Sequence, residues 1–370
     1  MSHILVTGGC GFIGKHLSLE LSRGGHRVRI LDTLSPQIHG DDPDLGWLDD
    51  AGIVLMRGSV CDPDACARAV DGVDAVVHLA AETGVGQSMY EIRRYMDVNV
   101  TGTATILEEV QRGEVERFVL SSSRAVYGEG TWRCTHCGPV HPTLRGFESG
   151  ETRQWNPPCP VCGETVQTLL PTSESGTFDP VSVYGISKAG QERLTLLSGR
   201  SSGVACTALR FFNVFGPGQS LRNPYTGVLA VFVNRARGNK PIDVFEDGNI
   251  LRDFVYIDDV VNAILRALET ESPDPFNIGS GRAISILEIA RQIVKELGAG
   301  SAITITGKGR VGDVRGIVGD TSLAHSCLGW TPSIGFEEGL SRFVSWAHGE
   351  SYSDTYERSL RELETKGLYR

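Results

Sequence analysis

A glycine-rich segment near the N-terminus constrains the fold of this 370-residue chain more than any other feature. Residues 7–14 read TGGCGFIG and follow a short apolar run, 3–6, that predicts a buried strand. The glycines at positions 8, 11 and 14 have the spacing of a tight strand-to-helix turn, and the helix is expected from about residue 11 to 24. Such a turn lets the backbone approach a pyrophosphate, while the helix N-terminus supplies N–H groups and a positive dipole. The segment therefore predicts a dinucleotide site, although a Gly-rich turn by itself is weak evidence.

An acidic residue follows the next predicted strand. Residues 27–31 alternate as a strand, and Asp32 closes it. A carboxylate at this place can accept hydrogen bonds from both ribose hydroxyls of NAD and repels the extra phosphate of NADP. The alternative is a helix or turn cap. In its strand–turn–helix context, Asp32 favours NAD as the cofactor.

Strands and helices are predicted to alternate through the first half of the chain. Further strands are expected at 75–79, 118–121 and 205–211, and helices at 98–110 and 183–197. This order implies right-handed βαβ units, and thus an α/β fold of the Rossmann type with a doubly wound parallel sheet. The segments beyond Asn213 are shorter and richer in loops. We expect an NAD-binding domain over 1–212 and mainly a smaller substrate-binding lobe over 213–370, with a charged, solvated helical tail from Tyr352.

The composition limits the partners and the compartment. The formal net charge is −10, which opposes nucleic acid or an anionic membrane as a main partner. The first apolar stretch is short and runs into glycines, so no signal peptide is predicted. No apolar run is long enough to span a bilayer. We expect a cytoplasmic protein.

Four of the nine cysteines form two CxxC pairs. The pairs are Cys134/Cys137 and Cys159/Cys162, each followed by a glycine. Four thiolates with this spacing suit a tetrahedral structural zinc, in a closed site without an open position for catalysis. Free thiols in a loose loop are the alternative. Residues 131–170 are expected to form a zinc-ribbon-like insertion outside the sheet.

A tyrosine and a lysine at positions i and i+4 are candidates for proton transfer. On a helix, Tyr184 and Lys188 share a face. The ammonium, together with the nicotinamide of NAD, would lower the pKa of the phenol, so that Tyr184 can take a proton from a hydroxyl. A serine run ending at Ser123 follows a predicted strand, where doubly wound folds place their ligands. A surface helix pair and a polar strand end are the alternatives.

The order of these motifs resembles that of the extended short-chain dehydrogenase/reductases, in particular the NDP-sugar epimerase and dehydratase family. The matching segments are TGGCGFIG (7–14), HLAA (78–81), VNVTGT (98–103), SSSRAVYG (121–128), YGISK (184–188), FFNVFGPGQ (211–219), RDFVYIDDVV (252–261), FNIGSG (276–281) and RVGDVRGIVGD (310–320). They extend from near residue 4 to about 347, apart from the insertion.

The resemblance implies a Ser–Tyr–Lys triad and two binding surfaces. Tyr184 would be the base, Lys188 would hold the nicotinamide ribose, and Ser123 would bind the reacting oxygen. The implied NAD site comprises Gly8, Gly11, Phe12, Ile13, Gly14, Asp32, Ser59, Val60, Leu79, Ala80, Ala81, Asn99, Tyr184 and Lys188. The implied substrate site comprises Thr83, Ser123, Arg124, Asn213, Arg252 and Arg310. For Arg252 and Arg310, ion pairs with Asp253 and Asp313 are the alternative. The family also implies a homodimer, formed through the helices after Asn99 and from near Tyr184.

The residues after the serine run select among the family's reactions. Family dehydratases carry an Asp–Glu pair where this chain has Arg124 and Ala125, and family reductases favour NADPH, which Asp32 opposes. A nucleotide-sugar 4-epimerase using NAD remains, with a dehydratase or 4-ketoreductase as alternatives. Thr83 stands where some galactose epimerases have lysine, and the cysteine insertion and the tail resemble a bacterial subgroup assigned to dTDP-L-rhamnose or UDP-glucose. A dinucleotide-binding sensor without catalysis is a further alternative, although this chain keeps all triad members.

Overall fold

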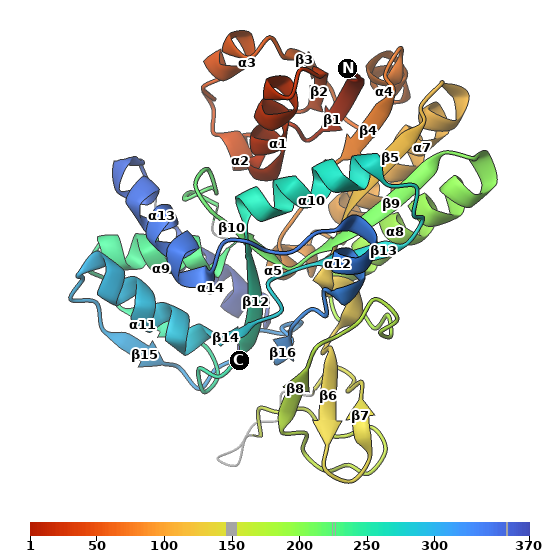
Figure 1. Ribbon diagram of the computed structural model, residues 1–370. Coiled ribbons are helices and arrows are strands. Elements are labelled where there is room, and N and C mark those ends of the chain that lie inside the picture. Colours follow the sequence, from red (N-terminus) through yellow and green to blue (C-terminus); the bar gives the residue numbers. More distant parts are fainter. Residues whose placement is uncertain (146–153, 224, 226, 353) are drawn as a thin grey trace.

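A seven-stranded sheet forms the centre of the computed structural model (Figure 1), which describes residues 1–145, 154–223, 225, 227–352 and 354–370. The strand order is β13-β9-β5-β4-β1-β2-β3, and all neighbouring strands are parallel. The strands are β1 (His3–Thr7), β2 (Arg27–Asp32), β3 (Val54–Arg57), β4 (Ala75–His78), β5 (Arg117–Ser123), β9 (Ala205–Phe211) and β13 (Pro275–Ile278). The predicted doubly wound α/β fold is confirmed.

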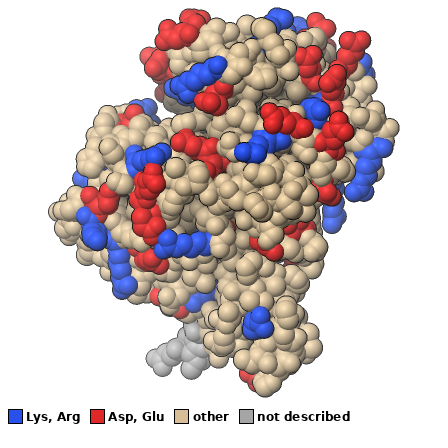
Figure 2. Space-filling view, viewed as in Figure 1, with Lys and Arg blue, Asp and Glu red and all other residues tan. Residues whose placement is uncertain are grey.

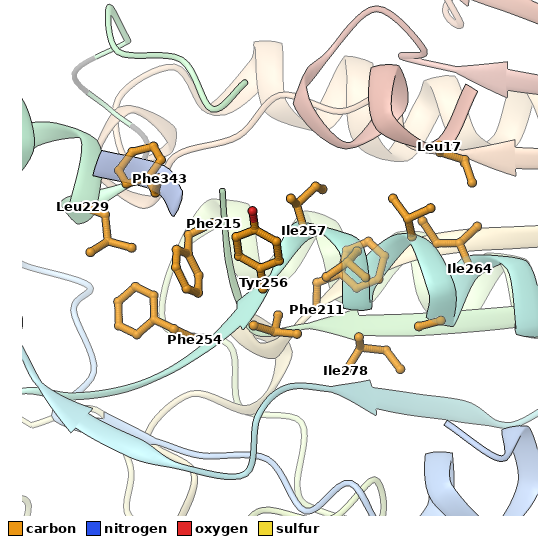
Figure 3. Close-up of a cluster of buried hydrophobic side chains, with 14 of the residues drawn as sticks. Leu17, Phe211, Phe215, Leu229, Phe254, Tyr256, Ile257, Ile264, Ile278 and Phe343 are labelled. Atoms are coloured by element: carbon orange, nitrogen blue, oxygen red, sulfur yellow. The ribbon is translucent and has the colours of Figure 1, made fainter. Parts of the chain in front are cut away.

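Helices cover both faces of this sheet, because its central strands are apolar on both sides. Helices α1 (Phe12–Arg23) and α10 (Ile257–Glu269) pack on one face, and α4 (Pro63–Val70), α7 (Gly102–Arg112) and α8 (Val183–Ser202) on the other (Figure 1). Figure 3 shows Leu17 of α1 beside Ile264 of α10 in the first of these layers. Short helical segments connect the layers: α2 (Pro36–His39), α3 (Gly46–Asp50), α5 (Val85–Ser88), α6 (Ile92–Tyr95), the π-helical η1 (Met96–Thr101), the 3₁₀ turn η2 (Arg124–Tyr127) and α12 (Ser322–Leu328).

A smaller lobe is built mainly from the second half of the chain. Its small sheets pair β10 with β12, β12 with β14 and β16, and β11 with β15. Its elements are β10 (Asn213–Phe215), β11 (Ile242–Val244), β12 (Leu251–Tyr256), β14 (Ala283–Ser285), β15 (Ile303–Ile305), β16 (Gly316–Ile317), α9 (Val228–Arg237), α11 (Ile286–Leu297), α13 (Phe336–Gly349) and α14 (Tyr356–Thr365). Because α10 and β13 return to the large sheet, residues 213–370 contribute to both bodies.

Aromatic side chains join the lobe to the large sheet. Phe215 packs edge-on against Phe254 and Tyr256, with ring centroids 6.0 and 5.6 Å apart. The same cluster continues into the α1/α10 layer through Ile257, as Figure 3 shows. Edge-to-face pairs of this kind add to the stabilisation from burial alone. The lobe and the large sheet therefore share one hydrophobic core.

The insertion protrudes from the lower end of the molecule in Figure 1. Strands β6 (Thr131–Cys134), β7 (Gly138–Val140) and β8 (Thr168–Leu170) form an antiparallel sheet in the order β7-β6-β8. Its small core contains Trp132 and Val166. In the view of Figure 2 it carries few charged side chains, whereas acidic and basic groups are interspersed over the rest of that face.

A buried ion-pair network fastens the insertion to the lobe. Arg145 donates to both carboxylate oxygens of Glu246, at 2.9 and 2.5 Å, and to Glu129 at 3.3 Å. Arg315 binds the same Glu246 at 3.0 Å. Both glutamate side chains are 0% exposed, so their charges depend on these arginines.

Within the described residues, no helix combines the length and the apolar character that crossing a membrane would require.

Candidate active site

The glycine-rich turn lies between β1 and α1 and has no room for side chains. Gly8 has φ +68°, and a Cβ there would lie 2.8 Å from the Ala80 backbone nitrogen. A Cβ at Gly14 would lie 2.4 Å from the Gly8 oxygen. Glycine is therefore required for the turn to close against the loop after β4. The N-terminus of α1 then faces the space where a pyrophosphate would bind.

Asp32 at the end of β2 is held by the turn itself. Its carboxylate accepts hydrogen bonds from the backbone N–H groups of Cys10 and Leu34, at 3.0 and 2.9 Å. The Nε2 atom of His39 lies 3.6 Å from it. Burial alone would raise the pKa of Asp32, but the contact with His39 and the hydrogen bonds from Leu34 and Cys10 outweigh it and lower that pKa. Asp32 is thus poised as an anion, and His39 is a contributor that the sequence did not indicate.

One cavity of about 430 Å³ collects nearly all the residues that were expected to bind NAD. It also contains Thr83, which was expected in the substrate site. The predicted residues that line it are Gly8, Gly11, Phe12, Ile13, Gly14, Asp32, Ser59, Val60, Leu79, Ala80, Ala81, Thr83, Ser123, Tyr184 and Lys188.

Asn99 is the exception among the expected NAD residues, since it lies behind the cavity wall. It is 0% exposed, and its amide donates to the Glu82 carbonyl at 3.0 Å and to the Ser187 hydroxyl at 2.9 Å. Its oxygen accepts from the Glu82 N–H at 2.7 Å. In this structure Asn99 holds the loop after β4 against α8, and its expected contact with the cofactor stays a prediction.

Ser123 and Tyr184 come together although the insertion separates them in sequence. Ser123 ends β5, and its side chain lines the same two cavities as the phenol of Tyr184. Tyr184 lies in the first turn of α8, where its N–H donates to Ser88 at 3.1 Å. Lys188, one turn further, donates to the Ser121 carbonyl at 2.8 Å. All three members of the expected triad therefore lie at the carboxyl end of β5.

The electrostatics of the triad differ from the expectation in one respect. Burial raises the pKa of Tyr184 above its usual value, while the nearby Ser123 hydroxyl and the charge of Arg124 oppose this effect. Burial lowers the pKa of Lys188 to about 7. The cation that acts on Tyr184 is thus Arg124, whereas the sequence assigned that effect to Lys188, whose ammonium donates to the Ser121 carbonyl.

A second cavity, of about 340 Å³, begins where the first ends. Ser123, Tyr184 and Asn213 line both cavities. Five of the six expected substrate residues line the second one: Ser123, Arg124, Asn213, Arg252 and Arg310. A hydroxyl pair thus stands at the meeting point of a dinucleotide cavity and a cation-lined cavity.

The three arginines of this second cavity have different partners. Arg310 pairs with Asp313 through two contacts of 3.1 and 2.8 Å, as the alternative interpretation proposed. Arg252 does not pair with Asp253, which accepts instead from Ser280, Gly281 and Gly319. Arg124 donates to the Asn213 oxygen at 3.1 Å. Burial lowers the pKa of Arg252 to about 9, and the neighbouring Arg124 adds to the effect.

These cations suit an anionic ligand. Guanidinium groups pair with phosphate oxygens through parallel hydrogen bonds. A diphosphate between Arg252 and Arg310 would relieve the repulsion among the buried arginines. Asp313, which fixes Arg310, is a site residue that the sequence indicated only as an ion-pair partner.

The four cysteines of the insertion form one cluster. The Sγ atoms of Cys134, Cys137, Cys159 and Cys162 all lie within 4.8 Å of one another. Backbone N–H groups also reach these sulfurs, as Val161 donates to Cys159 at 3.4 Å. Four convergent sulfurs fit a tetrahedral metal such as zinc.

The fold and the two joined cavities define a dinucleotide-dependent enzyme of the extended short-chain dehydrogenase/reductase class. The sequence profile of the NAD dependent epimerase/dehydratase family matches residues 4–144 and 160–279. The chain belongs to this family.

Individual relatives agree with this assignment. The chain is 40% identical to the dTDP-L-rhamnose 4-epimerase of Burkholderia thailandensis over 350 residues, which cover 93% of this chain and 94% of the relative. It is similar to the crystal structure of UDP-glucose 4-epimerase from Thermotoga maritima with UDP-glucose, with a TM-score of 0.77, 30% identity and coverage of 94% and 98%. It also resembles MoeE5 in complex with UDP-glucuronic acid and NAD, with a TM-score of 0.73, 28% identity and coverage of 94% and 99%.

Proposed function

We propose that the protein is an NAD-dependent nucleotide-sugar 4-epimerase. The observation that carries this proposal is the position of Ser123 and Tyr184 in the wall shared by the dinucleotide cavity and the cation-lined cavity. A sugar hydroxyl at this wall would lie beside a proton acceptor and face the cofactor at the same time. The relatives named as 4-epimerases, and the neighbour bound to NAD, support the same activity.

The residues of the wall supply the proton chemistry. NAD, held by the residues of the dinucleotide cavity, would supply the hydride acceptor and donor that reversible oxidation of a sugar C4–OH requires. Ser123 holds the reacting oxygen, and Tyr184 takes its proton and later gives it back. Arg124 stabilises the phenolate form of Tyr184. Lys188 is placed on the cofactor side, where its donors suit the ribose hydroxyls.

The substrate is proposed to be an NDP-hexose, with dTDP-L-rhamnose first and UDP-glucose second. Arg252 and Arg310 offer two cations to the diphosphate. A dehydratase needs an acid and a base beyond the triad to eliminate water. Arg124 and Ala125 stand where family dehydratases carry that pair, which disfavours this alternative, and Asp32 disfavours an NADPH-dependent ketoreductase.

Proton NMR of the purified protein with dTDP-L-rhamnose, and then with UDP-glucose and UDP-glucuronate, tests the activity. No reductant is added, because epimerisation consumes none. We expect one of these sugars to equilibrate with its C4 epimer while bound NAD is unchanged overall. Accumulation of a keto sugar would point to the dehydratase, and net oxidation of added NADH to the reductase.

We further propose a structural zinc ion held by Cys134, Cys137, Cys159 and Cys162. Thiolates in two CxxC pairs are the ligand set that zinc prefers in closed sites. The metal would hold together an insertion whose own apolar core is small. All four positions would be filled by protein ligands, so the ion would take no part in the reaction.

The remaining proposals concern the organisation of the protein. We propose residues 1–212 as the NAD-binding domain, with the insertion at 131–170, and 213–370 as mainly the substrate lobe. A homodimer is proposed through α7 and α8, where Ile186 and Leu197 are 49% and 65% exposed. Light scattering of the wild type and of Leu197→Glu tests the dimer, which the variant should dissociate. The cytoplasm is proposed as the location, which fractionation of cells tests.

A further inference from the structure

The C-terminal segment, residues 356–370, lies against the cation-lined cavity. Helix α14 presents one face to the cavity, through Tyr356, Ser359, Leu360 and Leu363. These positions recur with the helical spacing of three and four, so they form one stripe. The sequence predicted a solvated tail, but Leu363 is only 6% exposed. The segment is therefore part of the cavity wall.

The two ends of α14 rest on different bodies of the molecule. At the lobe end, the Tyr356 hydroxyl donates to Asp243 at 3.1 Å. At the other end, the ammonium of Lys366 lies 5.3 Å from the ring centre of Tyr90. Leu363 presses on α5, since a Cβ at Gly86 would lie 3.4 Å from its Cδ2 atom. The helix thus bridges the cleft between the substrate lobe and the NAD-binding domain.

The residues after α14 pair with the backbone around Arg310. The Gly309 N–H donates to the Arg370 carbonyl at 2.8 Å, and the Val311 N–H donates to the Leu368 carbonyl at 2.9 Å. These bonds hold both neighbours of Arg310. The ring of Tyr369, in the same stretch, packs 4.9 Å from Phe245, which itself lines the cavity.

We propose that the C-terminal segment is a wall of the nucleotide-sugar site that encloses the nucleoside diphosphate and positions Arg310 toward it. This rests on the proposed function, since the reacting sugar must lie at Ser123 and Tyr184. The nucleotide would then occupy the remaining part of the cavity, which is lined by Arg310 and by α14. Arg310 and Leu363 also share one neighbour, because both side chains approach the Cβ position of Gly86, at 3.5 and 3.4 Å. Leu363 and Arg310 therefore both pack against the same glycine of α5.

Calorimetric titration with dTDP and with UDP tests this proposal without requiring turnover. Leu363→Ala and Tyr369→Leu each remove one contact of the segment, and Arg361→Ala, on the exposed side of α14, is the matched control. We expect the Kd of the nucleoside diphosphate to rise about tenfold in the first two variants, as for loss of a buried interface contact. The Kd of NAD should stay within about twofold in all three, because the dinucleotide cavity is separate from these residues.

Unchanged dTDP and UDP affinity in Leu363→Ala and Tyr369→Leu would overturn the proposal. If those variants also lose NAD binding, their fold is damaged. The milder variant Tyr356→Phe then tests the proposal. That variant removes a single hydroxyl, and we expect about a threefold weaker dTDP or UDP binding from the lost hydrogen bond to Asp243. Unchanged binding there would overturn the proposal as well. Failure of the wild type to bind either nucleotide would instead contradict the proposed function. The proposal for the C-terminal segment would then be rejected as well, because it rests on that function.

Discussion

Arg124 and Tyr184 line the same cavity, and the charge of the buried guanidinium lowers the pKa of the phenol. Arg124 follows Ser123 directly, at the first position of η2. The group that tunes the proposed base therefore comes directly after the strand that ends in Ser123, and the sugar is expected to bind between Arg124 and Tyr184.

Arg124→Gln should move the pH dependence of turnover. The positive charge of Arg124 counteracts the rise in the pKa of Tyr184 that burial causes, so its loss raises that pKa further. We expect the acid limb of the kcat/KM profile to shift upward by about one pH unit. The measurement is the epimerisation rate between pH 5 and 10. Arg133→Gln, an exposed arginine of the insertion, should leave the profile in place, and an unmoved profile in Arg124→Gln would show that the guanidinium does not tune the base.

Tyr184→Phe should abolish turnover while leaving binding intact. The variant keeps the ring in α8 but removes the proton acceptor, and general base catalysis contributes about 10²- to 10⁴-fold to a rate. The rate is followed by NMR, and NAD and dTDP binding by calorimetry. Tyr352→Phe is a control outside both cavities. Residual activity within tenfold of the wild type would assign the base to another residue.

Lys188→Met should stabilise the ligand-free protein. Burial lowers the pKa of Lys188 from 10.5 to about 7. The charged ammonium therefore lowers the free energy of unfolding, and this loss is complete below pH 7. Between pH 7 and 10.5 the unfolded chain binds more protons than the folded one, and wild-type stability rises with pH as this cost disappears. We expect a gain of about 2 kcal/mol for the variant in urea unfolding at pH 7, shrinking toward pH 10. A gain that is constant over this range would contradict the lowered pKa.

Asp32→Asn should weaken the preference for NAD over NADP. The amide keeps the shape of the side chain but loses the charge that favours ribose hydroxyls and repels phosphate. We expect the Kd of NAD to rise about tenfold and that of NADP to fall. Since the pKa of Asp32 is lowered, the effect should be equal at pH 5 and pH 8. Fluorescence titration with both cofactors measures it. An unchanged ratio of the NAD and NADP affinities would mean that a group other than Asp32 distinguishes the two cofactors at the ribose.

Metal analysis of the purified protein should find about one zinc per chain. Cys159→Ser is expected to lose the metal and to lower the melting temperature, because the insertion has a small core. Cys327→Ser changes an exposed cysteine outside the cluster and should alter neither quantity. Protein that contains no zinc and melts identically with and without a chelator would leave the cysteines as free thiols.

The parts of the fold and site that sequence predicted are those encoded by local patterns. Residues 7–14 form a turn in which a side chain at Gly8 or Gly14 would clash with neighbouring backbone. Asp32 comes directly after a strand that the sequence pattern predicts. The spacing of Tyr184 and Lys188 was likewise enough to place both on one face of α8. In each case the chemistry follows from neighbours within a few residues along the chain, and from the general arrangement of parallel strands.

The parts that sequence missed depend on contacts across the chain. His39 acts on Asp32 through a loop, and Lys188 turns to the Ser121 carbonyl, which only the packing of α8 on β5 decides. The helical tail was predicted to be solvated because many of its residues are charged. The spacing of the residues from Tyr356 to Leu363 indicates a helix with one buried face. The sequence does not show that this face lines the cation-lined cavity.

The pairing of Arg145 with Glu129 and Glu246 bears on how this chain could have acquired its insertion. The arginine belongs to the insertion and the two fully buried carboxylates belong to the body. Excising the insertion alone would leave those carboxylates short of a cation, at a cost of several kcal/mol. Glu246 would keep Arg315 at 3.0 Å, but Glu129 would lose its ion pair with Arg145, so we expect an ancestor without the insertion to differ at position 129. We therefore expect gain or loss of the cysteine-bearing segment to be coupled in evolution to a substitution outside it.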